Sequence, residues 1–284
     1  MPTRLAYHLV VRAMEARAGV TPTQRLVATI QSVVHGHLDY NRYVAAGEQR
    51  ARQGAGAESI ARDLRDFFQT DLNPAVRGAH GLTSPAAVAF AYNSYNQSAQ
   101  IAVKTEISLK PCVGAQGSGV STRRTLVQST VDLELCRVAT LLVFDELQNR
   151  AASNRSVRHR LGMNRLGDVA AILGVEASPV AQLAALFEAQ GVMPIGEAAR
   201  ALGCHQRTLE RHLKKEGTTA EGIRMASRIL RAHQRFSGTE SLTTIAHDEG
   251  FSDLAHMTRS FRASCGMTPT LLRRVLHTGQ TLAA

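Results

Sequence analysis

The sequence contains no tryptophan, and aromatic residues make up only 5% of its 284 residues. Because strands favour aromatic and β-branched residues, this scarcity favours a mainly helical fold. Hydrophobic residues still reach 44%, enough to bury a sizeable core, so the composition argues against wholesale disorder. A chain of this length has room for two domains.

The chain also lacks an apolar stretch long enough to cross a bilayer. Its beginning does not resemble a signal peptide, because Arg12 ends the short apolar run of residues 9–11. We therefore expect a cytoplasmic protein without a membrane partner. The cysteines are too widely spaced for a zinc knuckle or a redox pair, which favours reduced thiols. They are Cys112, Cys136, Cys204 and Cys265.

Motifs of the common catalytic classes are missing as well. There is no nucleophile elbow and no metalloprotease motif, and the glycine-rich segment 114–119 lacks the Gly-Lys-Ser/Thr ending of a phosphate-binding loop. His35 and His37 have no evident third or fourth metal ligand, and His205 and His212 suit an exposed helix face better than zinc. We therefore expect no enzyme activity, no metal and no cofactor.

The charge balance points to another class of partner. The chain has 33 Lys and Arg against 23 Asp and Glu, a net charge of +10. Such an excess suits a polyanion, since each neutralised phosphate releases counterions. Alone it is a weak indication, because many soluble proteins are basic.

Residues 1–150 are predicted to form a mostly helical α+β domain with a small sheet, which senses a signal or mediates oligomerisation. Apolar periodicity predicts helices near 4–17, 22–35, 57–70, 84–94 and 130–148. Alternation over 101–109 predicts a half-buried strand that could pair with 122–128.

Residues 151–177 are predicted to be a basic linker between two domains. Over residues 149–167 arginines recur without any acidic residue, which favours a solvated charge run over a phosphate contact. They are Arg150, Arg155, Arg158, Arg160 and Arg165. From Ser178, which precedes Pro179, to Gly191 the punctuation is that of a capped helix.

Residues 178–284 carry two copies of one pattern, which predicts an all-α domain of two helix-turn-helix units in tandem. In each copy an alanine precedes a glycine by four residues: Ala199 and Gly203, then Ala246 and Gly250. The small alanine permits close helix crossing, and the glycine suits a turn with positive φ. An apolar pair then follows in each second helix: Leu209 and Leu213, Met257 and Phe261.

The faces opposite these apolar pairs are cationic. At about 100° per residue, Arg207, Arg211 and Lys214 share one face of the first unit. The second unit repeats this arrangement with Ser252, Ala255, His256, Arg259 and Arg262. A recognition helix in a major groove needs such a surface. A predicted helix near 220–236 would span roughly 24 Å, which could hold the pair near the ~34 Å spacing of successive major grooves.

Residues from about 178 to 278 resemble the DNA-binding domain of the AraC/XylS family of transcription regulators. The motifs that carry the resemblance are Glu197-Ala-Ala-Arg-Ala-Leu-Gly203, Arg207-Thr-Leu-Glu-Arg211, Arg228-Ile-Leu-Arg-Ala232, Gly250-Phe-Ser-Asp-Leu-Ala-His-Met-Thr-Arg-Ser-Phe261 and Gly266-Met-Thr-Pro269. The chain departs from the family at His205, where Ser or Thr usually opens the recognition helix, and at Ala220, where proline is common. The departure at His205 predicts a weaker helix cap.

The resemblance implies which side chains meet DNA. The base-contacting positions correspond to Arg207, Glu210, Arg211, Leu254, Ala255, His256 and Arg259. Arginine can donate two hydrogen bonds to guanine, glutamate can accept from cytosine, and small apolar side chains can contact a thymine methyl. Phosphate contacts, which set register, are expected from Lys214, Lys215, Ser252 and Arg262.

The sequence is therefore interpreted as a regulator that binds double-stranded DNA, an activator by family habit with RNA polymerase as a partner. Residues 1–150 would set its activity through a small-molecule effector or a regulatory protein, and a homodimer is left open. The alternative is a regulator controlled by protein–protein contact alone. A pocket lined by apolar and a few polar groups would favour the effector, and a flat apolar patch would favour the contact.

Overall fold

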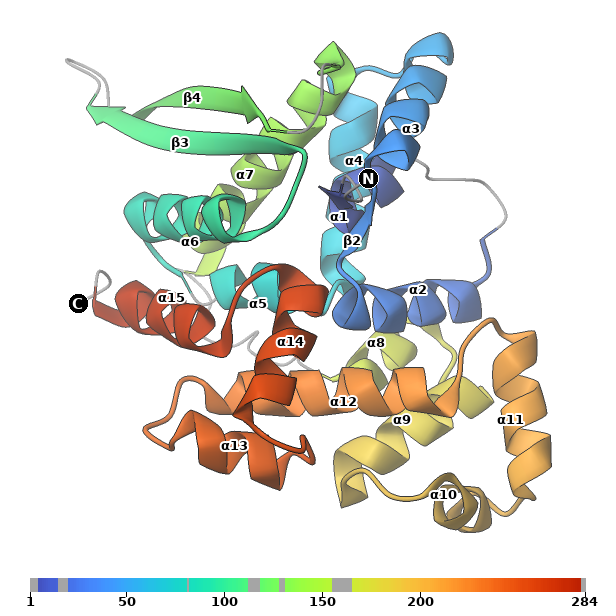
Figure 1. Ribbon diagram of the computed structural model, residues 1–284. Helices are drawn as coiled ribbons and strands as arrows, with labels where there is room; N and C mark the ends of the chain where they lie inside the picture. The colour runs from blue at the N-terminus through green and yellow to red at the C-terminus, as the bar shows by residue number, and fades with distance from the viewer. Residues whose placement is uncertain are drawn as a thin grey trace.

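A computed structural model describes residues 5–14, 20–80, 82–111, 118–127, 131–154 and 165–281, and it confirms a mainly helical fold. The N-terminal part forms one half of the molecule and the C-terminal helices the other (Figure 1). The helices of the N-terminal part are α1 (His8–Met14), α2 (Pro22–Val34), α3 (Tyr40–Arg52), α4 (Ala57–Thr70), α5 (Pro74–His80), α6 (Pro85–Ser98) and α7 (Glu134–Asn154). The C-terminal helices are α8 (Leu166–Leu173), α9 (Pro179–Gln190), α10 (Ile195–Ala201), α11 (Gln206–Lys215), α12 (Ala220–Arg235), α13 (Leu242–Asp248), α14 (Leu254–Cys265) and α15 (Pro269–Thr281).

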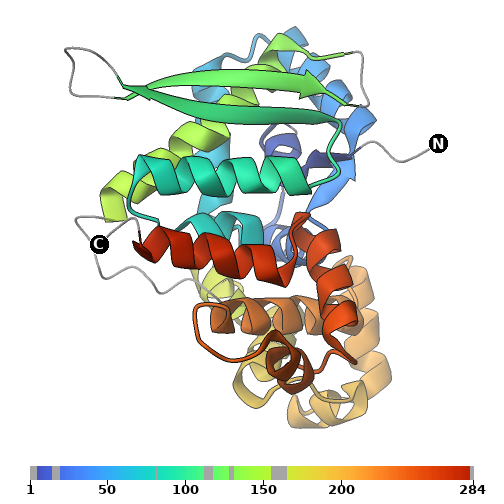
Figure 2. The ribbon, with the colours of Figure 1, turned by 60° about the vertical axis from the view of Figure 1, so that its left-hand side comes forward.

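Two small antiparallel sheets lie in the N-terminal part. Strands β3 (Val103–Pro111) and β4 (Ser118–Leu126) pair in the register Val103↔Leu126 to Pro111↔Ser118. The predicted pairing of these two segments is thus confirmed, although the strands lie at 103–111 and 118–126 rather than at 101–109 and 122–128. Helix α6 packs beneath β3 (Figure 2). Its asparagines bond to backbone groups on the free edge of that strand. The amide of Thr105 donates to Asn96 Oδ1 at 2.9 Å, and that of Ile107 to Asn93 Oδ1 at 2.8 Å. Side-chain amides thus satisfy backbone groups that a third strand would otherwise pair.

The prediction of one helix over 4–17 is wrong at its start. Residues Leu5–Tyr7 form β1, which pairs with β2 (His37–Asp39), and the helix begins at His8. The cause is a pairing partner some thirty residues away, which local periodicity cannot reveal. Helices α3 and α5 were not predicted. Cys112, residue 128 and segment 114–117 lie outside the described residues.

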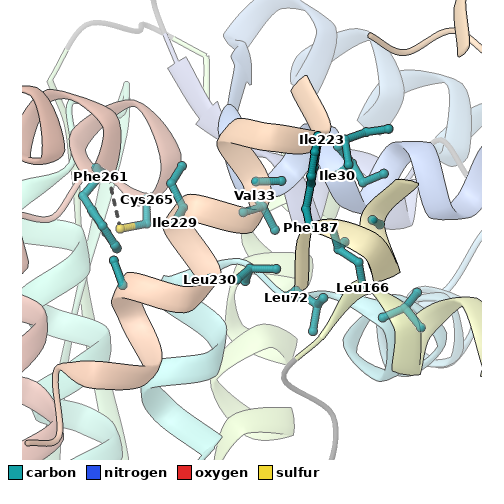
Figure 3. Close-up of a cluster of buried hydrophobic side chains, with 14 of the residues drawn as sticks. Ile30, Val33, Leu72, Leu166, Phe187, Ile223, Ile229, Leu230, Phe261 and Cys265 are labelled. Carbon is teal, nitrogen blue, oxygen red and sulfur yellow. Dashed lines mark hydrogen bonds between the residues drawn. The ribbon is translucent and has the colours of Figure 1, made fainter. Parts of the chain in front are cut away.

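The C-terminal helices surround α12. Its 16 residues place one face in the core, where the apolar side chains of that face and the one that directly follows the helix are buried. These are Ile223, Ala226, Ile229, Leu230 and Phe236. Helix α12 packs against α9 on one side and α2 on another, and it also contacts α13 and α14. Figure 3 shows the result: Ile30 and Val33 of α2 share one cluster with Phe187, Ile223 and Phe261.

The short helices α10 and α13 lie on the side of α12 away from α2, α5 and α15 in both ribbon views (Figures 1 and 2). Helix α15 runs back from the C-terminal half and packs on α5 and α6. The two halves are therefore joined along an extended seam. The N-terminal part covers one side of α12 and leaves the other side to the helix-turn-helix units.

The predicted domain bounds stay a prediction, but three observations bear on the proposed linker 151–177. Residues 155–164, with Arg155, Arg158 and Arg160, lie outside the described residues. Arg150 bonds to Glu146 Oε1 at 3.0 Å and covers the ring of Phe68. Helix α8 packs against α9 and α2. Part of this segment thus belongs to the core. Among the described helices, none is long and apolar enough to cross a bilayer.

The seam between the halves contains a buried histidine. His233 of α12 lies beside Phe236 and close to Gly78 of α5, and no hydrogen bond to its Nε2 occurs among the described residues. Burial, and then the nearby charge of Arg77, lower its pKa from 6.5 to about 4. The folded protein therefore keeps this ring neutral under conditions that protonate it in an unfolded chain.

We predict that His233 makes stability fall as the pH drops from about 7 to 4, because the unfolded chain binds the proton first. The loss should be on the order of 3 kcal/mol. Denaturant unfolding across this pH range measures it, with His233→Gln as the comparison. A variant with an equally steep decline would show that other groups cause it.

Candidate nucleic-acid interface

The first helix-turn-helix unit is built on a turn with one left-handed residue. Helix α10 buries Ala199, and Gly203 follows with φ of 69°. The amide of Gly203 donates to Arg200 O at 3.0 Å, and that of Cys204 to Ala199 O at 3.0 Å. This turn directs the chain into α11. His205, the residue just before α11, forms no side-chain cap, as predicted because the family usually has Ser or Thr at this position.

The second unit repeats this turn bond for bond. Ala246 is buried in α13, and Gly250 has φ of 78°. Its amide donates to His247 O at 3.0 Å, and that of Phe251 to Ala246 O at 2.9 Å. Two units with the same alanine, glycine and hydrogen bonds confirm the repeat predicted from the sequence. Helix α14, the second helix of this unit, differs from α11 because the side chain of Asp253 caps its start.

Both recognition helices bury the apolar pair predicted to lock them down. Leu209 and Leu213 of α11 and Met257 and Phe261 of α14 are all at most 2% exposed. The opposite face of α11 carries the residues predicted to meet DNA, and all are exposed. They are Arg207, Glu210, Arg211, Lys214 and Lys215. Glu210 accepts a bond from Gln206 Nε2 at 2.8 Å, so its carboxylate is already oriented.

Helix α14 exposes four of its six predicted contact residues. They are Ser252, just before the helix, and Ala255, Arg259 and Arg262 within it. Leu254 and His256 are half-buried. His256 Nδ1 lies 3.2 Å from Ser252 Oγ and its ring packs edge-on against Phe251, while Leu254 packs on the core. The structure thus brings Ser252 and His256 together and leaves Leu254 less surface for an outside partner.

The arginines of this region differ in whether an acid neutralises them. Arg231 and Arg235 of α12 form ion pairs with Glu249, at 2.6 and 3.0 Å, and Arg235 also pairs with Glu240 and Asp248. Among the described residues, the cations on the two outer faces form no ion pair. They are Arg207, Arg211, Lys214, Lys215, Arg259 and Arg262. Their charge remains for an external anion, as a phosphate backbone requires.

Sequence reasoning missed the contacts that join α14 to the N-terminal part. Asn73 Nδ2 donates to Ser264 O at 2.8 Å and to Ser32 O at 2.7 Å. The amide of Gly36 donates to Ala263 O at 3.3 Å, and a Cβ on Gly36 would come within 1.9 Å of Ser264 O. Only glycine permits this approach. No local pattern reveals such contacts, because their partners are about two hundred residues apart.

A cavity in the N-terminal part was missed too. All five tyrosines of the chain line it: Tyr7, Tyr40, Tyr43, Tyr92 and Tyr95. A signal was present, because every tyrosine lies before residue 96 and two pairs are three residues apart, on one helix face each. The histidine considered for metal binding, His37, lies beside this cavity, with Nε2 3.1 Å from Tyr95 Oη.

Comparisons with known proteins point to the C-terminal part. Residues 198–275 match the model of a family described as a helix-turn-helix domain. The chain is also similar to that in a crystal structure of the transcriptional regulator CdpR from Pseudomonas aeruginosa, at 15% identity and a TM-score of 0.32. That match covers 81% of this chain and 90% of the other. No curated protein sequence matches the chain.

The two turn glycines generate a stability prediction. Gly203→Ala should cost about 1–2 kcal/mol, since a Cβ there meets no neighbour and only the left-handed backbone penalises it. Gly250→Ala should cost more, because its Cβ would also lie 3.3 Å from Arg228 Nε. Gly203→Asn, which tolerates this backbone better, is the control. Denaturant unfolding would contradict the account if both alanine variants matched the wild type.

Proposed function

We propose that the chain is a DNA-binding transcription regulator of the AraC type, in which α11 and α14 read two adjacent major grooves. The match of residues 198–275 to a helix-turn-helix family model supports this proposal. The observation that carries this proposal is the repeated turn, followed each time by an exposed cationic face. One helix of 16 residues, α12, connects the two units. Its length of about 24 Å suits helices placed near the ~34 Å repeat of the duplex.

The proposed base readers are the ones that the family resemblance implies. On α11 they are Arg207, Glu210 and Arg211, and on α14 they are Leu254, Ala255, His256 and Arg259. Arg211 and Arg259 are the strongest candidates, because both are exposed and long enough to give bidentate bonds to guanine. Lys214, Lys215, Ser252 and Arg262 are proposed to bind phosphates and set the register.

We further propose that a small-molecule effector in the N-terminal cavity sets the activity. Tyr7 and Tyr95 both line the cavity, and their ring centroids are 5.0 Å apart. Tyr95 also stacks on His37, so the cavity wall is in contact with a residue beside the end of α14. Gly266, which caps the C-terminal end of α14, lies so close to His37 and Ala99 that a Cβ on it would be 2.6 Å from Ala99 Cβ and 3.2 Å from His37 Cε1. A change in the cavity wall would therefore press directly on the end of a recognition helix.

The cavity favours this proposal over control by protein contact alone. It is a partly open, mostly apolar space with a few polar groups, as effector sites generally are. The family resemblance adds activation through RNA polymerase, and a homodimer would double the contacts with DNA. Activation through RNA polymerase and dimerisation are therefore parts of the proposed function.

Selection of binding sites from random duplex DNA tests groove reading. The wild type should yield two separated groups of specified base pairs. Arg211→Ala should relax preference in one group and Arg259→Ala in the other, each at a cost of ~1–3 kcal/mol. Arg65→Ala is the control, because Arg65 is exposed on α4 and its loss changes the charge equally. Unchanged preferences in both variants would refute the assignment.

The proposed phosphate contacts generate a separate prediction. Replacing Lys214 and Lys215 by glutamine should weaken binding to all sequences alike, because phosphates carry no sequence information. The slope of log K against log salt should fall by roughly 0.9 for each phosphate that is no longer neutralised. Titrations at several salt concentrations measure the slope. A slope equal to that of the wild type would place both lysines away from the phosphates.

A further inference from the structure

The cavity of the N-terminal part has a composition that restricts what it can hold. It is partly open to solvent, has a volume of about 80 Å³, and lies between β1, α1, α3, α5, α6, α7 and the β3–β4 hairpin. Most lining side chains are aliphatic or aromatic, among them Val10, Val76, Ala91, Ile101 and Val143. The five tyrosines complete the wall. Apolar surface and flat rings of this kind favour a ligand with a ring of its own.

Most polar groups of the wall form hydrogen bonds within the protein. Tyr40 Oη donates to Val131 O at 2.7 Å, and Tyr43 Oη donates to Cys136 O at 2.8 Å. Tyr92 Oη lies 3.4 Å from Thr140 O, and the Asn96 side chain bonds to Tyr92 O and to the amide of Thr105. A ligand with many polar atoms would therefore lose its bonds to water and gain few in return.

One ionised group, Arg124, lies among the residues that line the cavity. Its Nε and Nη2 donate to the two oxygens of Asp132 at 2.8 and 2.6 Å, and Nη1 donates to Thr105 Oγ1 at 2.9 Å. Burial is the largest single influence on the pKa of Arg124 and lowers it. The hydrogen bonds that Arg124 donates to Asp132, the charge of Asp132 and the nearby Tyr43 and Tyr92 together outweigh burial and raise the pKa. The guanidinium thus stays charged and is neutralised by its own acid.

Because that charge is matched, an anion entering the cavity would find no unpaired cation among the described residues of its wall. A carboxylate or sulfonate would be desolvated beside Asp132 without compensation. Building on the proposed effector function, we propose that this cavity binds an uncharged, mainly apolar molecule of one or two rings and rejects its acidic analogues. The Arg124–Asp132 pair is the element that sets this selectivity.

A matched pair of fluorescent probes tests the proposal on the full chain without DNA. 1-Aminonaphthalene is uncharged at neutral pH, and 5-aminonaphthalene-1-sulfonate adds one negative charge to the same rings. We expect the first to bind one site per chain and the second to bind at least tenfold more weakly. Because the chain has no tryptophan and all its tyrosines surround the cavity, bound probe should quench tyrosine emission by energy transfer. Equal affinity for the two probes, or binding without that quenching, would overturn the proposal.

Two variants sharpen the test. Ala91→Leu places bulk on the cavity wall and should weaken binding of 1-aminonaphthalene, whereas Ala45→Leu, on an exposed position of α3, should not. Asp132→Asn removes the acid that neutralises Arg124 and should bring the sulfonate's affinity to or above that of the neutral probe. If Ala91→Leu binds like the wild type, or Asp132→Asn leaves the sulfonate excluded, the assignment fails.

The result of the probe-binding experiments does not depend on whether α11 and α14 read DNA grooves. Groove reading is tested by the selection of binding sites from random duplex DNA. Effector control is tested by one added arm, in which 1-aminonaphthalene is titrated into the complex with selected DNA. Probe binding with no change in DNA affinity would uphold the ligand class and refute effector control through DNA affinity. No probe binding by a chain that still selects DNA would refute the ligand class alone.

Discussion

The burial of α12 is the constraint on which the rest of the structure depends. This helix has Ile223, Ala226 and Ile229 fully enclosed, and it packs against α9, α2, α13 and α14. A helix held on several sides can neither bend nor roll without opening a cavity, which costs a few kcal/mol for each large side chain displaced. The two helix-turn-helix units are therefore parts of one body rather than modules on a flexible tether.

The same core extends into the N-terminal part, so the two halves are mechanically connected. Ile30 and Val33 of α2 lie in the cluster that holds Phe187 and Phe261, while Asn73 and Gly36 bond to the last turn of α14. Tyr95 links that contact to the cavity through His37. Under the proposed effector control, a ligand that shifts the cavity wall would act on α14 through packed side chains, and the bistable element would be the seam between α14 and α2.

Local chemistry explains which features could be predicted from the sequence. The Ser178 cap, the left-handed glycines at 203 and 250 and the buried faces of α11 and α14 each depend on residues a few positions apart, and all were predictable. The strand Leu5–Tyr7 and the contact of Asn73 with Ser264 depend on partners far along the chain, so periodicity could not show them. The tyrosine cavity lies between these cases. The three-residue spacing within each tyrosine pair is visible in the sequence, but the sequence does not show that all five tyrosine side chains meet around one cavity.

A change in the spacing of the DNA site tests the rigid two-unit body most directly. Starting from the selected site, five or ten base pairs are inserted between its two groups, and affinity for the full chain is measured. Ten base pairs add about one turn, so they restore the phase while adding ~34 Å to the separation. The account predicts that both insertions reduce affinity to that of a single group. Affinity retained with the ten-base-pair insertion would contradict it, because the units would then move independently.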